Sequence, residues 1–223
     1  MILVIRGHIR DSFSNKKLYN FIERLYNLFP TLVIFIHTWD IFSNNISWRQ
    51  VPIDNTFVTK DTIYNYFGTL RDCINQILID DDNQIELRGR LEGKINNGNC
   101  PILGWKNHWY GQYQIFDYIY KNFNCENRLV INTRFDILNF INMVNEDRIL
   151  DFIFKNNNIT PSKNIFIVNE EMEGIDNIYL GNIETMYKLV HIFHYDLDNI
   201  LTQFPDVENQ EKLVFKINSL MFN

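Results

Sequence analysis

The chain has 223 residues, of which 46% are hydrophobic and 15% aromatic, with a net charge of −6. Such a length and apolar content exclude a disordered segment and suffice for a well-buried core. The negative charge argues against non-specific binding to nucleic acid, so no nucleic-acid partner is expected.

Targeting and cysteine features predict a cytoplasmic protein. No run of about 18 apolar residues occurs, so no membrane span is predicted, and the N-terminus shows no secretory signal. Cys73, Cys100 and Cys125 are odd in number and widely spaced, which favours reduced thiols over disulfides or a zinc site. The chain contains no alanine. AT-rich codon usage would explain this, and it points to an AT-rich bacterium or a large DNA virus, with the host cytoplasm as the compartment for a virus.

The first half of the chain predicts a β-α-β unit and then further elements. The apolar run at residues 2–5 predicts a buried strand, and helical spacing predicts a helix from Ser12 or Ser14 to Leu28, before Pro30. A second strand is predicted at 32–36 and a loop at 41–56. A helix at 59–74, a short strand at 77–79 and a long loop at 88–103 follow.

The second half continues the alternation of strands and helices. A helix is predicted at 105–123, a strand at 129–132, a helix or surface insertion at 140–157, a strand at 165–168, and helices at 183–201 and 208–221. With no internal repeat or linker, this order predicts a single α/β domain over residues 1–223, with a mostly parallel central sheet flanked by helices. Ligands of such sheets bind outside the carboxyl ends of the strands.

The first strand ends in a basic turn. Its candidate residues are Arg6, Gly7, His8 and Arg10. Two guanidinium groups and an imidazole at a helix N-terminus suit a diphosphate or a base, and Gly7 permits a close backbone approach. The alternative is a solvated basic turn.

The second strand ends in His37, Trp39 and Asp40. A histidine followed by these residues at a strand end indicates a ligand pocket. The alternative is core packing with the polar tips of the rings satisfied.

An acidic run, Asp80 to Asp82, follows the short third strand. Several carboxylate oxygens in one place suit a hard cation. Acidic residues and an asparagine before apolar Ile85 and Leu87 are also typical of a hairpin turn, and we favour the turn.

The helix predicted from residue 105 opens with aromatic and polar side chains. Its candidate sugar-binding residues are Trp105, Lys106, Asn107, Trp109 and Tyr110. Indole rings stack on sugar faces, and the polar groups between them hydrogen-bond hydroxyls. The alternative is a core helix with buried aromatic residues.

The strand at 129–132 ends in Asn132-Thr133-Arg134-Phe135-Asp136. Arg134 and Asp136 lie two residues apart along an extended chain and so share one side. Asp136 suits a metal ion or a ribose, and Arg134 suits a phosphate or Asp136 itself. A purely structural Arg–Asp pair is the alternative.

A glycine-bounded segment, residues 174–181, precedes the helix that carries Glu184 in its first turn. Asp176 in this segment is a candidate general base for an acceptor hydroxyl, with Asn177 beside it. A role confined to the helix entry is the alternative.

Several of these motifs resemble those of one family. Residues 130–136 resemble the "V-I-R-T-R-F-D" strand end of glycosyltransferases with the GT-A fold that build bacterial lipopolysaccharide and capsule, and similar proteins occur in large DNA viruses. Residues 174–186 resemble the family's "N-D-Q-F-A-I-G-…-E-A-M" segment. Residues 6–10 and 37–40 resemble its "S-G-H-x-R" and "S-T-W-D" patterns. These short motifs are spread over most of the chain.

The resemblance implies a Rossmann-like GT-A fold and transfer of a sugar from a nucleotide-sugar donor to a glycan hydroxyl in surface-glycan synthesis. It places Arg134 and Asp136 at the donor diphosphate, in place of the usual Asp-x-Asp metal motif. Dependence on Mn²⁺ or Mg²⁺ is therefore expected to be weak or to rest on Asp136 alone. Asn132 stands where the family often has Arg, and Asp176-Asn177 where Asp-Gln is frequent.

These interpretations give three groups of residues. Asp176 is the expected catalytic base if the enzyme inverts, and Asp136 is the expected metal ligand. The expected donor-binding residues are Arg6, Gly7, His8, Arg10, His37, Trp39, Asp40, Arg134 and Asp136. The expected acceptor or sugar-binding residues are Trp105, Lys106, Asn107, Trp109, Tyr110 and Asn177.

Other classes of protein are also considered. A non-catalytic carbohydrate-binding or assembly protein of the same fold is the alternative to an enzyme. The chain has no Gly-x-x-x-x-Gly-Lys-Ser/Thr loop and no Gly-x-Gly-x-x-Gly turn. These absences disfavour a P-loop kinase, a sulfotransferase and a dinucleotide enzyme.

Overall fold

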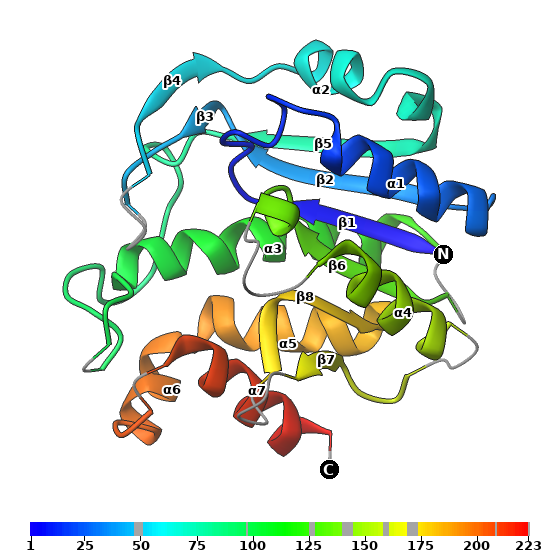
Figure 1. Cartoon of the computed structure of the whole chain (residues 1–223). Helices are drawn as coiled ribbons and strands as arrows, with labels where there is room; N and C mark the ends of the chain where they lie inside the picture. Colours follow the sequence, from blue (N-terminus) through cyan, green and yellow to red (C-terminus); the bar gives the residue numbers. More distant parts are fainter. Residues whose placement is uncertain are drawn as a thin grey trace.

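A six-stranded sheet runs through the computed structural model, in the strand order β5-β2-β1-β6-β8-β7 (Figure 1). The structure describes residues 1–46, 51–96, 98–124, 128–139, 145–157, 161–168, 174–207 and 209–222. The strands of the sheet are β1 (Ile2–Arg6), β2 (Val33–Trp39), β5 (Ile74–Asp80), β6 (Val130–Arg134), β7 (Ile165–Val168) and β8 (Gly174–Gly181). Among the described strands of this sheet, β8 alone runs in the direction opposite to the other five. The predicted α/β fold with a mostly parallel central sheet is confirmed.

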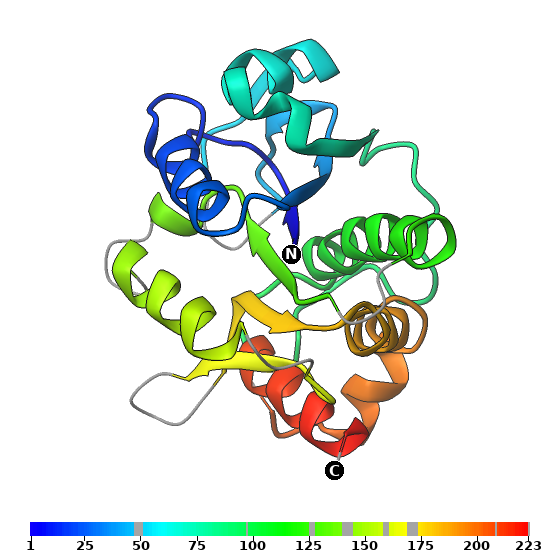
Figure 2. The ribbon, with the colours of Figure 1, turned by 90° about the vertical axis from the view of Figure 1, so that its right-hand side faces the viewer.

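Helices cover both faces of the sheet (Figure 2). Because side chains alternate along a strand, Leu3 and Ile5 pack on one face and Ile2 and Val4 on the other. The first face is covered by α1 (Lys17–Leu28), α2 (Lys60–Phe67) and α4 (Glu146–Asn156). The second is covered by α3 (Ile102–Asn122), α5 (Ile183–Tyr195), α6 (Leu197–Gln203) and α7 (Gln210–Met221). Among the described residues, no helix is long and apolar enough to cross a membrane.

Side-chain caps start several of the described helices, and the sequence revealed them only in part. Thr59 and Asn182 form capping boxes at α2 and α5, and the Asn209 side chain accepts from two backbone amides at α7. The predicted caps at Ser12 and Ser14 are wrong, because α1 begins at Lys17 without a side-chain cap. Residues before it form turns, and Phe13 there stacks on Tyr66 at 3.9 Å between ring centroids.

Three predicted segments differ from the structure. The predicted loop at 41–56 contains the antiparallel pair β3 (Ile41–Ser43) and β4 (Asp54–Phe57). The helix predicted at 59–74 ends at Phe67 and continues as the 3₁₀ helix Gly68–Cys73. The segment 174–181 is a strand, so the role of Asp176 as a helix-entry residue is wrong.

The remaining elements lie close to their predicted bounds. The helix predicted at 183–201 divides into α5 and α6 at Asp196, and a short 3₁₀ helix, Ile137–Asn139, follows β6. Of the helix or surface insertion predicted at 140–157, the described part contains the helix α4, and residues 140–144 lie outside the described residues. Cys73 is a free cysteine, whereas Cys125 also lies outside the described residues.

Candidate functional site

Three of the predicted strand-end motifs lie side by side. In the parallel register of the sheet, Arg6 at the end of β1 pairs with His37 of β2 on one side and Arg134 of β6 on the other. The chain then turns away through Gly7 and Arg10, whose φ angles of 93° and 54° lie in the left-handed region. This conformation is strained for an arginine and is common where backbone is shaped for a ligand.

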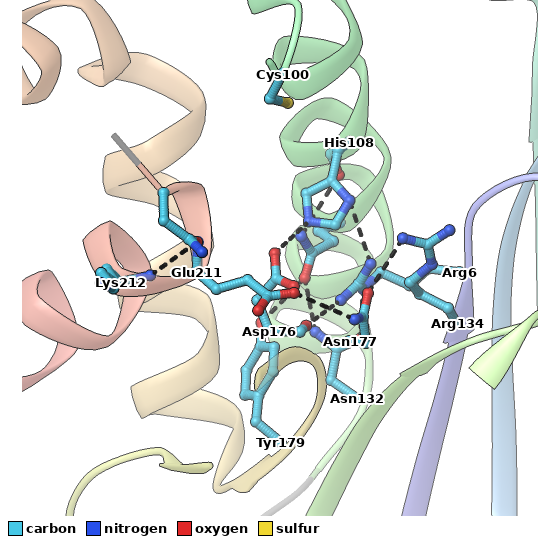
Figure 3. Close-up of polar contacts among 12 residues, drawn as sticks. Arg6, Cys100, His108, Asn132, Arg134, Asp176, Asn177, Tyr179, Glu211 and Lys212 are labelled. Atoms are coloured by element: carbon cyan, nitrogen blue, oxygen red, sulfur yellow. Dashed lines mark hydrogen bonds and ion pairs between the residues drawn. The ribbon is translucent and has the colours of Figure 1, made fainter. Parts of the chain in front are cut away.

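The reversed direction of β8 adds a fourth segment. Thr133 of β6 pairs with Ile178, so Asp176 and Asn177 at the start of β8 lie beside the carboxyl end of β6. The first turns of α3 and the start of α7 close the cleft (Figure 3). Ten predicted site residues line it: Arg6, Gly7, His8, Arg10, Trp39, Trp105, Asn107, Arg134, Asp176 and Asn177.

Arg6 is fixed by polar contacts from three elements. Its Nε donates to Asn132 Oδ1 at 3.0 Å and its Nη2 donates to the backbone oxygen of Asp176 at 2.8 Å. Its Nη1 lies 3.3 Å from His108 Nδ1. Burial lowers the pKa of Arg6 to about 10, which Asp176 partly opposes, so the guanidinium stays charged at neutral pH. Arg6 therefore puts a positive charge at the floor of the cleft.

Asp136 is buried between two arginines. Its Oδ2 accepts from Arg10 Nη1 at 2.6 Å, and Arg134 bonds both oxygens, from Nε and Nη2, at 2.7 Å each. Arg134 Nη1 also donates to Asn177 Oδ1 at 3.1 Å. Burial lowers the pKa of Arg134, but the carboxylate of Asp136 outweighs it and the pKa is raised overall.

The residues present do not fit a resident divalent ion at Asp136. Both of its oxygens are engaged by guanidinium groups, and the side chain is 2% exposed and does not line the cleft. A cation there would have to displace Arg10 and Arg134. Among the described residues, no three His, Cys, Asp or Glu side chains converge as a metal site. The assignment of Asp136 as metal ligand thus has no support in this geometry.

The acidic run after β5 is also engaged in local contacts. Asp80 Oδ2 lies 3.0 Å from His37 Nε2, and Asp82 accepts from Asn44. Asp81 Oδ1 accepts from the backbone nitrogen of Asn83 at 2.8 Å, as an Asx turn does. The favoured turn is therefore present, but residues 85–92 form no strand, so the predicted hairpin is not formed.

Three buried polar atoms on the cleft wall have no hydrogen-bond partner among the described residues. They are Nε2 of His8, Nε1 of Trp105 and Oδ1 of Asn107. Asn107 is 5% exposed and Trp105 is 3% exposed, so bulk water does not reach these two side chains to form the missing hydrogen bonds. Because buried polar atoms are nearly always hydrogen-bonded, ordered water or a polar ligand in the cleft would complete the hydrogen bonds of these three atoms.

Burial makes His8 a neutral side chain. Its ring stacks on Trp39 at 5.8 Å, and burial together with the charge of Arg10 lowers its pKa to about 3. The unfolded chain takes up the proton near pH 6.5. Between these two pKa values the unfolded state binds more protons at His8 than the folded state does. The free energy of unfolding therefore falls as the pH falls.

We therefore expect His8→Asn to reduce the loss of stability between pH 6.5 and pH 4. The measurement is the urea midpoint of the parent and the variant at several pH values in this window. His191→Asn is the control, because His191 is exposed on α5. Equal slopes for the parent and His8→Asn would show that His8 takes up its proton equally in both states.

Several predicted site residues lie away from the cleft wall. Trp109 is fully buried and stacks on Phe193 at 4.3 Å, so its assignment to a sugar subsite is wrong and the core alternative holds. Lys106 Nζ contacts Asp198 Oδ2 at 3.0 Å and the backbone oxygen of Arg88, which anchors the long loop.

His37, Asp40 and Tyr110 lie behind the wall. His37 is fully buried, and a Cβ on Gly111 would come within 2.5 Å of its ring, so α3 crosses the end of β2 closely. Tyr110 stacks on Trp39 at 6.1 Å. Burial, with Asp81 adding to it, raises the pKa of Asp40. These three residues do not line the cleft, so the structure gives no support for direct contact between them and a donor.

Sequence reasoning missed several residues of the wall. Three of them are His108, which lies between the predicted residues Asn107 and Trp109 of α3, and Gln210 and Glu211, which lie at the start of α7. The remaining wall residues are Asn44, Ile46, Cys100, Pro101 and Gly104. Helical spacing was the available signal for His108, because it lies one turn from Trp105. No local pattern marks Glu211.

Comparison with known proteins gives similarity to solved structures only. No protein-family model matches the chain, and no curated protein matches it. One similar structure is the galactosyltransferase LgtC in complex with donor and acceptor sugar analogues, with a TM-score of 0.47, 11% identity and coverage of 100% of this chain and 70% of that chain. An active-site mutant of LgtC gives a TM-score of 0.39 at 11% identity and the same coverage.

Proposed function

We propose that this chain is a glycosyltransferase that moves a sugar from a nucleotide-sugar donor to a hydroxyl of a glycan acceptor. The observation that carries the proposal is the convergence of four separate segments on one cleft at the carboxyl edge of the sheet. Residues 6–10 and 134 supply positive charge, 105–108 supply aromatic and polar groups, and 176–177 supply a carboxylate and an amide. All four segments belong to motifs that resemble those of the GT-A family or to the aromatic helix entry.

The arginines suit the leaving group of such a reaction. A nucleoside diphosphate gains negative charge as its bond to the sugar breaks, and positive groups fixed in advance stabilise that charge. Arg10 is the best placed to donate directly, because its Nε and Nη2 have no partner among the described residues. Arg6 and Arg134 add charge, although their contacts to protein atoms already hold them.

Asp176 suits the role of the base. Its side chain is 8% exposed and lies on the cleft wall, so it reaches a ligand while largely removed from bulk water. In an inverting transfer, the acceptor oxygen forms a bond to the sugar carbon, and the bond from that carbon to the diphosphate breaks. The hydroxyl proton passes to the Asp176 carboxylate.

Binding of nucleoside diphosphates tests the first half of the proposal. We expect uridine or guanosine diphosphate to stabilise the protein by about 2.7 kcal/mol at a hundredfold excess over Kd. The same stabilisation is expected with EDTA as with Mn²⁺, since arginines supply the charge. Thermal unfolding followed by fluorescence measures both conditions. Stabilisation by neither diphosphate, and by no nucleotide sugar, would contradict the proposal.

Arg10→Ala is expected to lose this stabilisation while keeping the fold, because Arg134 still bonds both oxygens of Asp136. Arg71→Ala is the matched control, since Arg71 is exposed in the 3₁₀ helix after α2. If Arg10→Ala responds to the diphosphates like the parent, the anion lies elsewhere in the cleft. A parent that binds donors but neither transfers nor hydrolyses them, across a panel of glycan acceptors, would favour the non-catalytic carbohydrate-binding protein.

A further inference from the structure

His108 lies between a buried cation and the proposed base (Figure 3). Its Nδ1 is 3.3 Å from Arg6 Nη1, and its Nε2 is 3.9 Å from Asp176 Oδ2. The side chain is 18% exposed and lines the cleft from the second turn of α3. The two nitrogens of one ring therefore face two different elements of the site.

Arg6 determines which ring nitrogen carries the proton. A guanidinium has only donors, so the contact with Arg6 requires Nδ1 of His108 to accept. A neutral imidazole with Nδ1 as acceptor carries its hydrogen on Nε2. The Nε2–H group then faces Asp176.

Arg6 is itself held in place by a chain of hydrogen bonds. Gln112 Oε1 accepts from Asn132 Nδ2 at 2.7 Å and from the Tyr179 hydroxyl at 3.0 Å. This fixes the Asn132 amide so that its Oδ1 faces Arg6 Nε at 3.0 Å. The guanidinium group of Arg6 that contacts His108 is therefore held in place by buried hydrogen bonds.

From this geometry we infer that His108 is a positioning residue that presents an Nε2–H group to the carboxylate of Asp176. The separation of 3.9 Å is longer than a hydrogen bond, and a small rotation of either side chain or a bridging hydroxyl closes it. One oxygen of Asp176 is then oriented by His108, and the other is left for the acceptor hydroxyl. The role of Asp176 here rests on the proposed function, whereas the tautomer of His108 does not.

Two conservative variants separate the two nitrogens of the ring. In His108→Asn the amide oxygen can occupy the place of Nδ1 and accept from Arg6, but no donor reaches Asp176. In His108→Gln the amide nitrogen can occupy the place of Nε2 and donate to Asp176. We expect His108→Asn to lower kcat by roughly 10- to 100-fold, the range for groups that orient a functional side chain. The KM for the donor should not change, and His108→Gln should recover most of the lost kcat.

NMR of the parent protein tests the tautomer without any ligand. Histidine ring ¹⁵N shifts distinguish a protonated Nε2 from a protonated Nδ1, and the signal of His108 is assigned by its loss in His108→Asn. Protonated Nε2 at neutral pH is expected, and protonated Nδ1 would overturn the inference. Equal kcat in the Asn and Gln variants, whether both low or both parental, would overturn it as well. A parent that binds no nucleotide would contradict the proposed function and leave the tautomer measurement standing.

Discussion

Asp176→Asn is expected to lower sugar transfer by about 10²–10⁴-fold, the usual contribution of a general base. The amide keeps the size of the carboxylate but does not take up the proton of the acceptor hydroxyl. Donor affinity should stay nearly unchanged, because the guanidinium groups of the cleft are retained. The measurement is product formation from a set of radiolabelled nucleotide sugars, with donor affinity determined in parallel by calorimetry.

The control for this variant is Asp151→Asn, which makes the same change on the exposed surface of α4. Transfer by Asp176→Asn at the parental rate would show that the base lies elsewhere. Glu211 would then be tested next, because among the described residues it is the second carboxylate on the cleft wall. Its Oε1 accepts from Asn177 Nδ2 at 3.4 Å.

The second large effect concerns stability and not catalysis. Asp136→Asn is expected to lower the free energy of unfolding by about 3–5 kcal/mol, the range for breaking a buried ion pair. The substitution leaves Arg10 and Arg134 close together without the carboxylate that they share. For a chain of this length, such a loss lowers Tm by on the order of 10 °C. Thermal and urea unfolding measure it.

Asp72→Asn provides the comparison, because Asp72 is 90% exposed. If Asp136 instead served chiefly as a ligand of the donor or of a metal ion, Asp136→Asn would lose ligand binding with little change in Tm. A structural role of Asp136 thus predicts a large fall in Tm, whereas a ligand-binding role predicts a loss of ligand binding at a nearly unchanged Tm.

The parts of the fold that depend on local pattern were predictable. The apolar runs of β1, β2 and β6 and their polar ends were identified from sequence, and the register places Arg6, His37 and Arg134 in one row. Neighbouring parallel strands bring their carboxyl ends to the same edge, so short-range pattern and sheet geometry together predicted which residues meet at the cleft.

The parts that depend on distant contacts were not predictable. The strand β8 was not predicted, because the glycine-bounded segment 174–181 was interpreted only as the approach to the following helix. The role of Asp136 depends on Arg10, which is 126 residues away in the chain. Trp105 and Trp109 look alike in sequence and both contact Phe193. Only the three-dimensional packing shows that Trp105, and not Trp109, lines the cleft.

The cleft also draws on nearly the whole length of the chain, from Arg6 in the first strand to Glu211 in the last helix. During synthesis on the ribosome, its wall is therefore incomplete until α7 has emerged and packed. A nascent chain that ends before Glu211 lacks part of this wall, so we expect it to bind a nucleoside diphosphate more weakly than a chain that includes α7. Protection from proteolysis by a nucleoside diphosphate should therefore appear only after α7 has packed, which makes it a measure of the docking of this helix.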